Sequence, residues 1–307
     1  MDSVHRTVLL NETIAGLDLH PGYLVLDCTF GGGGHSREIL EKYPNVKIIA
    51  LDQDQNAWEK AKSKFKGLEG RITFLNKNFR DIDDSEIDGI IFDLGLSSDQ
   101  LENSGRGFSF LKNEPLLMTL KEPARLGHSG GNPSEYLLTA YDVVNAWSEK
   151  SLADIIYGYG EERYSRRIAR GIIEARKKSK IENTFDLVKI IEKAVPGAYR
   201  RRRLHFATRT FQAIRIAVND ELGALKEGLE KGFNALKAGG RMSVISFHSL
   251  EDRIVKRFFS AKGGSASGGQ ENRVAKLINK KPITAQKKEI NNNPRARSAK
   301  LRILEKL

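Results

Sequence analysis

The feature that most constrains the fold is a run of four consecutive glycines at residues 31–34, directly after a short apolar segment. Residues 24–26 are apolar and end at Asp27, and residues 36–43 have the composition of a helix. Because glycine has no Cβ, the backbone of such a loop can approach a ligand closely. The order of strand, glycine loop and helix predicts an α/β sheet that binds a ligand beyond the carboxyl ends of its strands.

The spacing of the glycines narrows the choice of ligand. A dinucleotide fingerprint that began at Gly31 would need a glycine where Ser36 stands, and the end of a phosphate-binding P-loop is also missing. A second apolar segment, 46–51, precedes Asp52, about 20 residues after the glycines, where a carboxylate can accept both ribose hydroxyls. The pair fits S-adenosylmethionine as well as NAD, and a plain strand-to-helix turn is the alternative.

Two more predicted strands carry candidate site residues at their carboxyl ends. Residues 72–75 are followed by Phe79, whose ring is placed either to stack on adenine or to pack in the core. Residues 87–94 form a nearly continuous apolar run, which is typical of a buried parallel strand. This strand brings Asp93 to its end with Ser97 just beyond, and catalytic groups of such sheets lie at that edge.

Beyond these strands the pattern changes from alternating strands and helices to helices alone, which predicts a doubly wound α/β sheet interrupted by a helical insert. We place the ligand-binding domain at 1–106 and 207–307 and the insert at 107–206. An apolar stripe predicts one long helix over 208–236 that packs on the sheet.

A net charge of +12 favours a polyanionic partner, with nucleic acid as the leading class. Arginines cluster on a predicted helix of the insert, in a run at 200–203, and in the carboxyl-terminal tail. Solvated basic faces, or a basic edge strand that prevents aggregation, are the alternatives. The arginines that we expect to contact RNA are Arg166, Arg167, Arg201, Arg209, Arg295 and Arg297.

Cys28 is the only cysteine, which excludes an internal disulfide and a zinc site made of cysteines. No apolar run approaches the roughly 18 residues of a membrane span, and the first residues are charged where a signal peptide needs an apolar core. We therefore expect a cytoplasmic protein that does not enter the membrane.

Several stretches together resemble one family, the bacterial small-subunit ribosomal RNA (cytosine-N4) methyltransferases, and they cover nearly the whole chain in order. They are residues 5–10, 29–36, 93–101, 106–110, 160–169, 207–213, 245–253 and 293–298.

The resemblance implies a Rossmann-like class I methyltransferase sheet with an inserted helical domain that recognises the substrate. It implies S-adenosylmethionine as the methyl donor and a cytidine in the decoding centre of 16S rRNA, within the small ribosomal subunit, as the acceptor. The family's cofactor positions carry over onto Gly33, Gly34, His35, Asp52, Phe79, Asp93 and Gln100. His35 and Gln100 come from the resemblance alone, whereas the residues themselves already pointed to the others.

The exocyclic amine of cytosine is a poor nucleophile, because its lone pair is delocalised into the ring. An enzyme helps by aligning N4 with the methyl group and by accepting a hydrogen bond from N4. Asp93 is the first candidate for that acceptor, with Ser97 behind it; the alternative is that Asp93 only orients the cofactor. This chemistry requires no metal.

The chain departs from the family at Leu117 and Thr119, where relatives carry an acid and an arginine, and at Phe206, where they carry proline. These changes keep open a second hypothesis, a non-catalytic RNA-binding ribosome assembly factor with a vestigial methyltransferase fold. An NAD-dependent oxidoreductase is disfavoured by the missing third fingerprint glycine. The sequence leaves a homodimer open.

Overall fold

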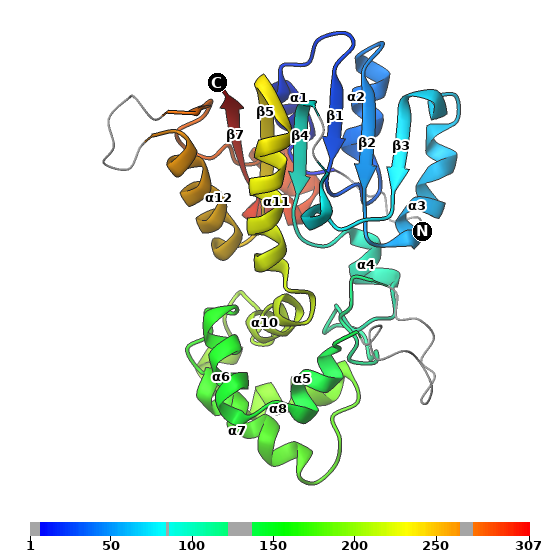
Figure 1. Ribbon diagram of the computed structural model, residues 1–307. Helices are drawn as coiled ribbons and strands as arrows, with labels where there is room; N and C mark the ends of the chain where they lie inside the picture. The colour runs from blue at the N-terminus through cyan, green and yellow to red at the C-terminus, as the bar shows by residue number, and fades with distance from the viewer. Residues whose placement is uncertain (1–6, 84–85, 122–136, 265–272) are drawn as a thin grey trace. The chain divides into compact units, whose positions relative to one another are not determined.

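The computed structural model describes residues 7–83, 86–121, 137–264 and 273–307, which form two compact units (Figure 1). Unit 1 comprises Met1–Gly95 and Leu222–Leu307, and unit 2 comprises Leu96–Glu221. The first two residues of the motif at 5–10 lie outside the described residues.

Unit 1 is built on a seven-stranded sheet with the order β3-β2-β1-β4-β5-β7-β6. The strands are β1 (Leu24–Asp27), β2 (Lys47–Leu51), β3 (Ile72–Leu75), β4 (Ile87–Asp93), β5 (Leu236–Ser246), β6 (Ala275–Leu277) and β7 (Lys300–Lys306). Strands β1 to β5 run parallel, and β7 is antiparallel to both β5 and β6. The strand order reverses between β1 and β4, and ligands bind beyond the strand ends at such a switch point.

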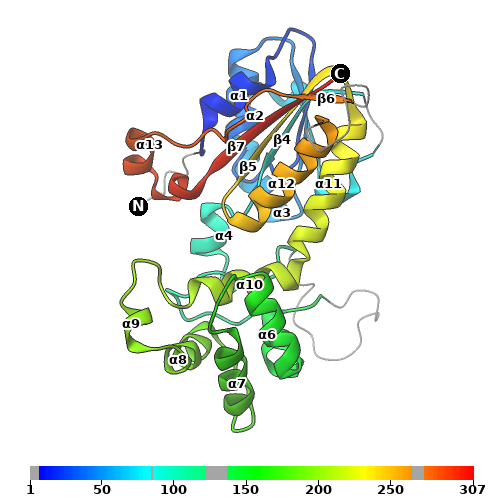
Figure 2. The same cartoon turned by 90° about the vertical axis from the view of Figure 1, so that its left-hand side faces the viewer.

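Helices lie on both faces of this sheet (Figure 2), and an apolar core fills the space on each face. Side chains of α1 (Leu10–Leu17), α2 (Gly34–Lys42) and α3 (Gln55–Lys62) pack with Val25 and Ile91. Side chains of α11 (Glu221–Ala235) and α12 (Ser249–Lys262) pack with Leu26 and Phe92. Neighbouring residues of one strand thus enter opposite cores, as the two-residue period of a strand requires. The α/β fold that the sequence predicts is confirmed. A last short helix, α13 (Lys287–Asn292), precedes β7.

Unit 2 is helical and has its own apolar core. Its helices are α4 (Ser98–Asn103), α5 (Ala140–Ala146), α6 (Glu149–Gly158), α7 (Ser165–Arg176), α8 (Thr184–Ala194), α9 (Gly197–Arg200) and α10 (Thr208–Asn219). The residues at helical spacing, such as Leu152 and Ile156 on α6 and Ile168 and Ile172 on α7, are fully buried there. Within the described residues, no helix combines the length and the apolar character that crossing a bilayer requires.

The predicted long helix over 208–236 is wrong, because the chain breaks it at Asp220. This residue has a φ of 46° and ends α10, and α11 begins at the next residue. The apolar stripe therefore divides between two cores: Phe211 belongs to the core of unit 2, whereas Leu229 belongs to the core of unit 1.

The predicted domain boundaries also need correction, because unit 2 starts at Leu96 and ends at Glu221, outside the predicted 107–206 on both sides. Leu101 of α4 and Ile214 of α10 pack into the core of unit 2. The basic tail is not an edge strand, since β7 lies between β5 and β6.

Candidate functional site

Asp27 closes the end of β1 and ties it to the helix that follows. Its side chain is buried; Oδ2 accepts a hydrogen bond from the Ser36 hydroxyl at 2.6 Å, and Oδ1 accepts one from the Thr29 backbone N–H at 3.2 Å. Burial raises its pKa to about 6, although both hydrogen bonds act in the opposite direction. The carboxylate therefore fixes the start of the glycine loop to the start of α2.

The glycine loop makes a tight turn that side chains would prevent. Gly33 caps α2 with a φ of 73°, and a Cβ there would lie 2.7 Å from Phe30 and 2.8 Å from Phe65. A Cβ on Gly34 would lie 1.8 Å from Oγ1 of Thr7. Glycine is thus required at both predicted positions for this backbone path.

Asp52 follows β2 and holds the same loop from the neighbouring strand. Its Oδ2 accepts a hydrogen bond from the Gly31 N–H at 2.7 Å, and its Oδ1 accepts one from the Asp54 N–H at 2.8 Å. Burial raises the pKa of Asp52 to about 6, against these two hydrogen bonds. A carboxylate offers about four lone-pair sites, so both oxygens can accept further hydrogen bonds from a ligand.

Asp93 ends β4, the strand beside β1. Its backbone N–H donates to Oγ1 of Thr29 at 2.6 Å, and its Oδ2 lies 3.7 Å from Nδ1 of the buried His35. Its Oδ1 is buried and has no hydrogen-bond partner among the described residues. Burial, together with the nearby carboxylates of Asp27 and Glu251, raises the pKa of Asp93 to about 8.

This raised pKa predicts how stability depends on pH. Between the ordinary aspartate pKa of 3.8 and about 8, folded Asp93 keeps a proton that the unfolded chain releases. The free energy of unfolding should therefore fall as pH rises through this range, by at most about 1.4 kcal/mol per pH unit from this group. Urea denaturation of the ligand-free protein at pH 5 and pH 8 measures the effect. Asp93→Asn should reduce the difference, and an unchanged difference contradicts the assignment.

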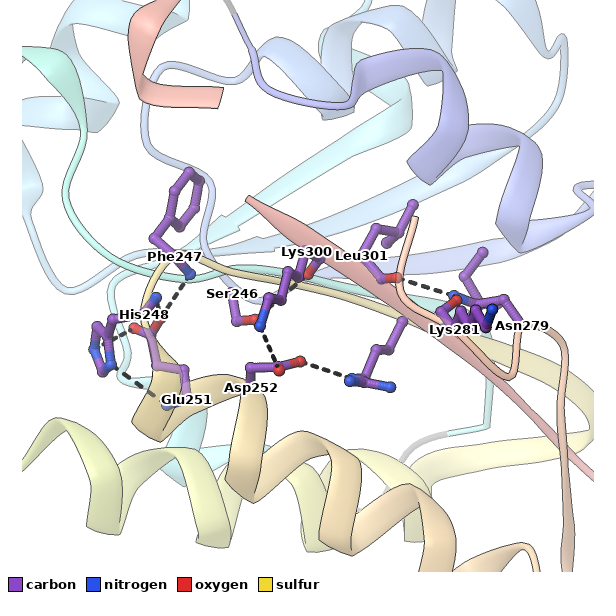
Figure 3. Close-up of polar contacts among 11 residues, drawn as sticks. Ser246, Phe247, His248, Glu251, Asp252, Asn279, Lys281, Lys300 and Leu301 are labelled. Atoms are coloured by element: carbon purple, nitrogen blue, oxygen red, sulfur yellow. Dashed lines mark hydrogen bonds and ion pairs between the residues drawn. The ribbon is translucent and has the colours of Figure 1, made fainter. Parts of the chain in front are cut away.

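A fourth carboxyl, that of Glu251, lies on the first turn of α12, just after the carboxyl end of β5 (Figure 3). The Glu251 side chain is buried; Oε2 accepts hydrogen bonds from the backbone N–H groups of Phe247 at 2.8 Å and His248 at 3.2 Å. His248 caps α12 and its Nε2 lies 3.1 Å from Oε1 of Glu251. His248 and Glu251 thus form the capping box of α12, with Glu251 three positions after the capping residue.

Phe79 begins a short 3-10 helix (Phe79–Asp81) after β3. Its ring meets that of Phe92 edge-on, with 5.5 Å between ring centroids, and belongs to the margin of a sheet core. The ring is only half-buried. The core role is therefore observed, and the predicted stacking on adenine stays a prediction.

Ser97 and Gln100 form the capping box of α4. The Ser97 hydroxyl accepts from the Gln100 N–H at 3.1 Å, and the Gln100 side chain accepts from the Ser97 N–H at 2.9 Å. Both belong to unit 2, whereas the glycine loop, His35, Asp52, Phe79 and Asp93 all belong to unit 1. Unit 1 thus assembles six of the predicted cofactor residues along one edge of its sheet.

The predicted RNA-contacting arginines divide into exposed and structural ones. Exposed side chains are those of Arg166 and Arg167 on α7, Arg201 after α9, and Arg297. Arg295 is half-buried. Arg209 donates a hydrogen bond to the carbonyl oxygen of Glu161 at 2.7 Å. It stabilises a turn inside unit 2, a role that the sequence did not indicate.

The carboxyl edge of the sheet in unit 1 fits a ligand that carries a positive charge and hydroxyl groups. It offers three buried or half-buried carboxyls, Asp27, Asp52 and Asp93, next to a glycine loop that a ligand can approach. Burial raises the pKa values of all three, and repulsion from neighbouring carboxylates adds to this for Asp52 and Asp93; a cationic ligand would act in the opposite direction. The buried, unpartnered Oδ1 of Asp93 points to a group that donates a hydrogen bond there.

Comparison with known proteins gives matches over the whole chain. The model of the MraW methylase family matches residues 2–307. The chain is 44% identical to the ribosomal RNA small subunit methyltransferase H of Brevibacillus brevis, covering 99% of this chain and 98% of that protein. It is 48% identical to the protein of the same name from Nostoc punctiforme, covering 99% and 94%. A solved rRNA methylase from Streptococcus thermophilus aligns with a TM-score of 0.44 at 11% identity, over 98% of each chain.

Proposed function

The chain belongs to the MraW methylase family, and on this premise we propose that it transfers a methyl group from S-adenosylmethionine to N4 of a cytidine in small-subunit ribosomal RNA. Relatives that share 44% and 48% of its residues are named as methyltransferases of that RNA. The decoding centre of the assembled subunit is the substrate that we propose, and a cytoplasmic location follows from it.

The observation that carries the proposal is the pair of adjacent strand ends at β1 and β4. There the Thr29 hydroxyl accepts from the Asp93 N–H, and the Thr29 N–H donates to Asp27. The loop and the proposed acceptor are therefore fixed to one another by a chain of hydrogen bonds. Groups held in place in this way lose little freedom when a substrate binds.

S-adenosylmethionine, when bound, supplies a methyl group on a positively charged sulfur. Gly33 and Gly34 would let the loop backbone approach it, Asp52 would accept from its ribose hydroxyls, and Phe79 would cover its adenine. His35 and Gln100 are the other residues that we propose to contact the cofactor.

Asp93 is the proposed acceptor of the N4 hydrogen bond, through the Oδ1 atom that has no other partner among the described residues. The ionised carboxylate of Asp93 accepts this hydrogen bond more strongly than the protonated form. A positive charge nearby would lower the pKa of Asp93 and so favour the ionised form. Ser97 is the second candidate. The cytidine must leave its base stack to reach such a site.

The substrate RNA is proposed to contact the exposed arginines Arg166, Arg167, Arg201 and Arg297, with Arg295 as a partial contact. Each guanidinium in contact with a phosphate replaces counterions, so this part of the affinity should weaken with salt. Arg209 is the least suited of the six, because its side chain already donates to Glu161.

One observation favours a non-catalytic assembly factor as the second candidate. At position 119, where relatives carry arginine, the short Thr119 side chain is buried, and its hydroxyl has no hydrogen-bond partner among the described residues. An assembly factor would bind the RNA without consuming the cofactor.

Transfer of labelled methyl from S-adenosylmethionine to small ribosomal subunits that lack the modification tests the proposal, with naked ribosomal RNA and DNA in parallel. Label in the subunits and not in DNA is the expected result. RNA binding without any transfer, by a protein that binds the cofactor, contradicts catalysis and supports the assembly factor.

A further inference from the structure

Unit 2 contains a group of arginines that are stacked on tyrosine rings. The guanidinium of Arg163 lies 4.7 Å from the ring centroid of Tyr164 and 5.4 Å from that of Tyr199. Arg202 lies 5.2 Å from Tyr199, and Arg167 lies 5.8 Å from Tyr164. We call these three arginines and two tyrosines the arginine platform. Stacking on an aromatic face orients a guanidinium while its N–H groups stay available.

A buried carboxylate fixes the rings of the platform. Glu162 is fully buried; one oxygen accepts from the Tyr164 N–H at 2.8 Å, and the other accepts from the Tyr199 hydroxyl. The two rings meet edge-on at 5.0 Å. Burial and Glu162 raise the pKa of Tyr199 to about 12, so its hydroxyl remains a donor at neutral pH. The arginines thus stand on a rigid base.

The arginines of the platform form no ion pair with a carboxylate among the described residues. In the described ranges, no carboxylate lies within ion-pair distance of Arg163, Arg167 or Arg202, and all three side chains are exposed. Other arginines of the same unit are paired: Arg170 lies 3.6 Å from Glu149, and Arg215 lies 2.8 Å from Glu221. An excess of oriented, unpaired guanidinium groups calls for an anion.

A cleft borders the platform between α6 and α7. Its volume is about 360 Å³, and its lining includes Arg163, Arg166, Arg167 and the exposed Tyr157. The one acid in the lining, Asp154, already pairs with Lys150 at 2.7 Å. The cleft is therefore open to a negatively charged chain that passes between the two helices.

We propose that the arginine platform and this cleft bind the phosphate backbone of single-stranded RNA. The inference rests on the proposed function for the identity of the nucleic acid. Planar guanidinium groups match phosphate bidentately, and several in fixed positions match successive phosphates of one strand. Such contacts hold the RNA in register without reading its sequence.

The double variant Arg163→Gln, Arg202→Gln tests the proposal against Lys177→Gln, Lys178→Gln. The control removes the same charge from exposed lysines at the end of α7, which lie on no aromatic ring of the described part of the chain. Fluorescence anisotropy with a labelled single-stranded RNA, across a range of salt concentrations, gives the dissociation constants. The platform variant should bind about tenfold more weakly, and the slope of log affinity against log salt should fall by about 1.4, or 0.7 per lost contact. The control should lose less than about threefold.

A third variant, Arg163→Lys with Arg202→Lys, keeps both charges and loses the planar fork. We expect weaker binding with a nearly unchanged salt slope, and thermal melting shows that each variant folds. Equal losses in the platform variant and the lysine control overturn the proposal, as does a platform variant that binds RNA normally but fails on assembled subunits, which indicates a protein partner. Methyl transfer by the wild type is measured in parallel. If the wild type transfers no methyl group but its RNA binding depends on the platform, the proposed function is wrong and the proposed role of the platform stands.

Discussion

Replacing Asp93 with asparagine is expected to lower kcat for methyl transfer by about 10²- to 10⁴-fold, the usual contribution of a positioned acid or base. The amide keeps the size of the side chain and removes the ionisable oxygen that lies buried without a partner among the described residues. Binding of S-adenosylmethionine should change far less, because the glycine loop and Asp52 remain. Single-turnover transfer and calorimetric cofactor binding, measured on the same preparation, separate the two effects.

The matched control is Asp83→Asn, an exposed acid of the same unit that pairs with the exposed Lys77. It should transfer methyl at the wild-type rate. If Asp93→Asn also transfers at the full rate while it binds the cofactor normally, Asp93 does not accept the N4 hydrogen bond. If it loses both binding and transfer, Asp93 orients the cofactor instead.

Replacing Asp252 with alanine is expected to lower the free energy of unfolding by about 3–5 kcal/mol, the usual cost of leaving a buried charge unpaired. Asp252 accepts a hydrogen bond from Lys300 at 2.9 Å (Figure 3). It accepts another from Arg302 at 2.8 Å, and the Arg302 side chain is only 9% exposed. Arg302 lies on β7, inside the sheet. In Asp252→Ala the guanidinium of Arg302 stays buried but loses the carboxylate that pairs with it.

Equilibrium denaturation in urea at pH 7 measures this loss. Asp154→Ala is the control, since its ion pair with Lys150 is exposed on both sides and should contribute less than about 1 kcal/mol. The pKa of Asp252 is lowered, with hydrogen bonds from Arg302 and Lys300 outweighing burial, so its contribution is present at neutral pH and lost in acid. A loss below about 1 kcal/mol for Asp252→Ala contradicts the role given to this pair.

The fold was predictable where periodicity and glycine positions act locally. The loop at 31–34 and the apolar run ending at Asp93 were enough to predict parallel strands with a site at their carboxyl ends. The break at Asp220 was not predictable, because the apolar stripe of α10 and α11 continues through it. The periodicity of a sequence indicates which face of a helix is apolar. It does not indicate into which of two cores that face packs.

The candidate site was predictable at strand ends and less so at side chains that serve the local backbone. Asp52 and Asp93 were predicted as site residues from their positions after strands, and the structure places both at strand ends. The tie from Thr29 to Asp93 joins residues 64 apart in the chain, so no local pattern could indicate it. The hydrogen bonds of Arg209 and Glu162 likewise depend on tertiary contacts.

The identity of the methylated nucleoside tests the proposed reaction most directly. Small subunits that lack the modification are incubated with the protein and S-adenosylmethionine, and their RNA is digested and analysed by chromatography and mass spectrometry. We expect N4-methylcytidine as the new nucleoside, formed by the wild type and strongly reduced with Asp93→Asn. A methyl group on carbon 5 of cytosine or on another base contradicts it, as does the absence of any new nucleoside.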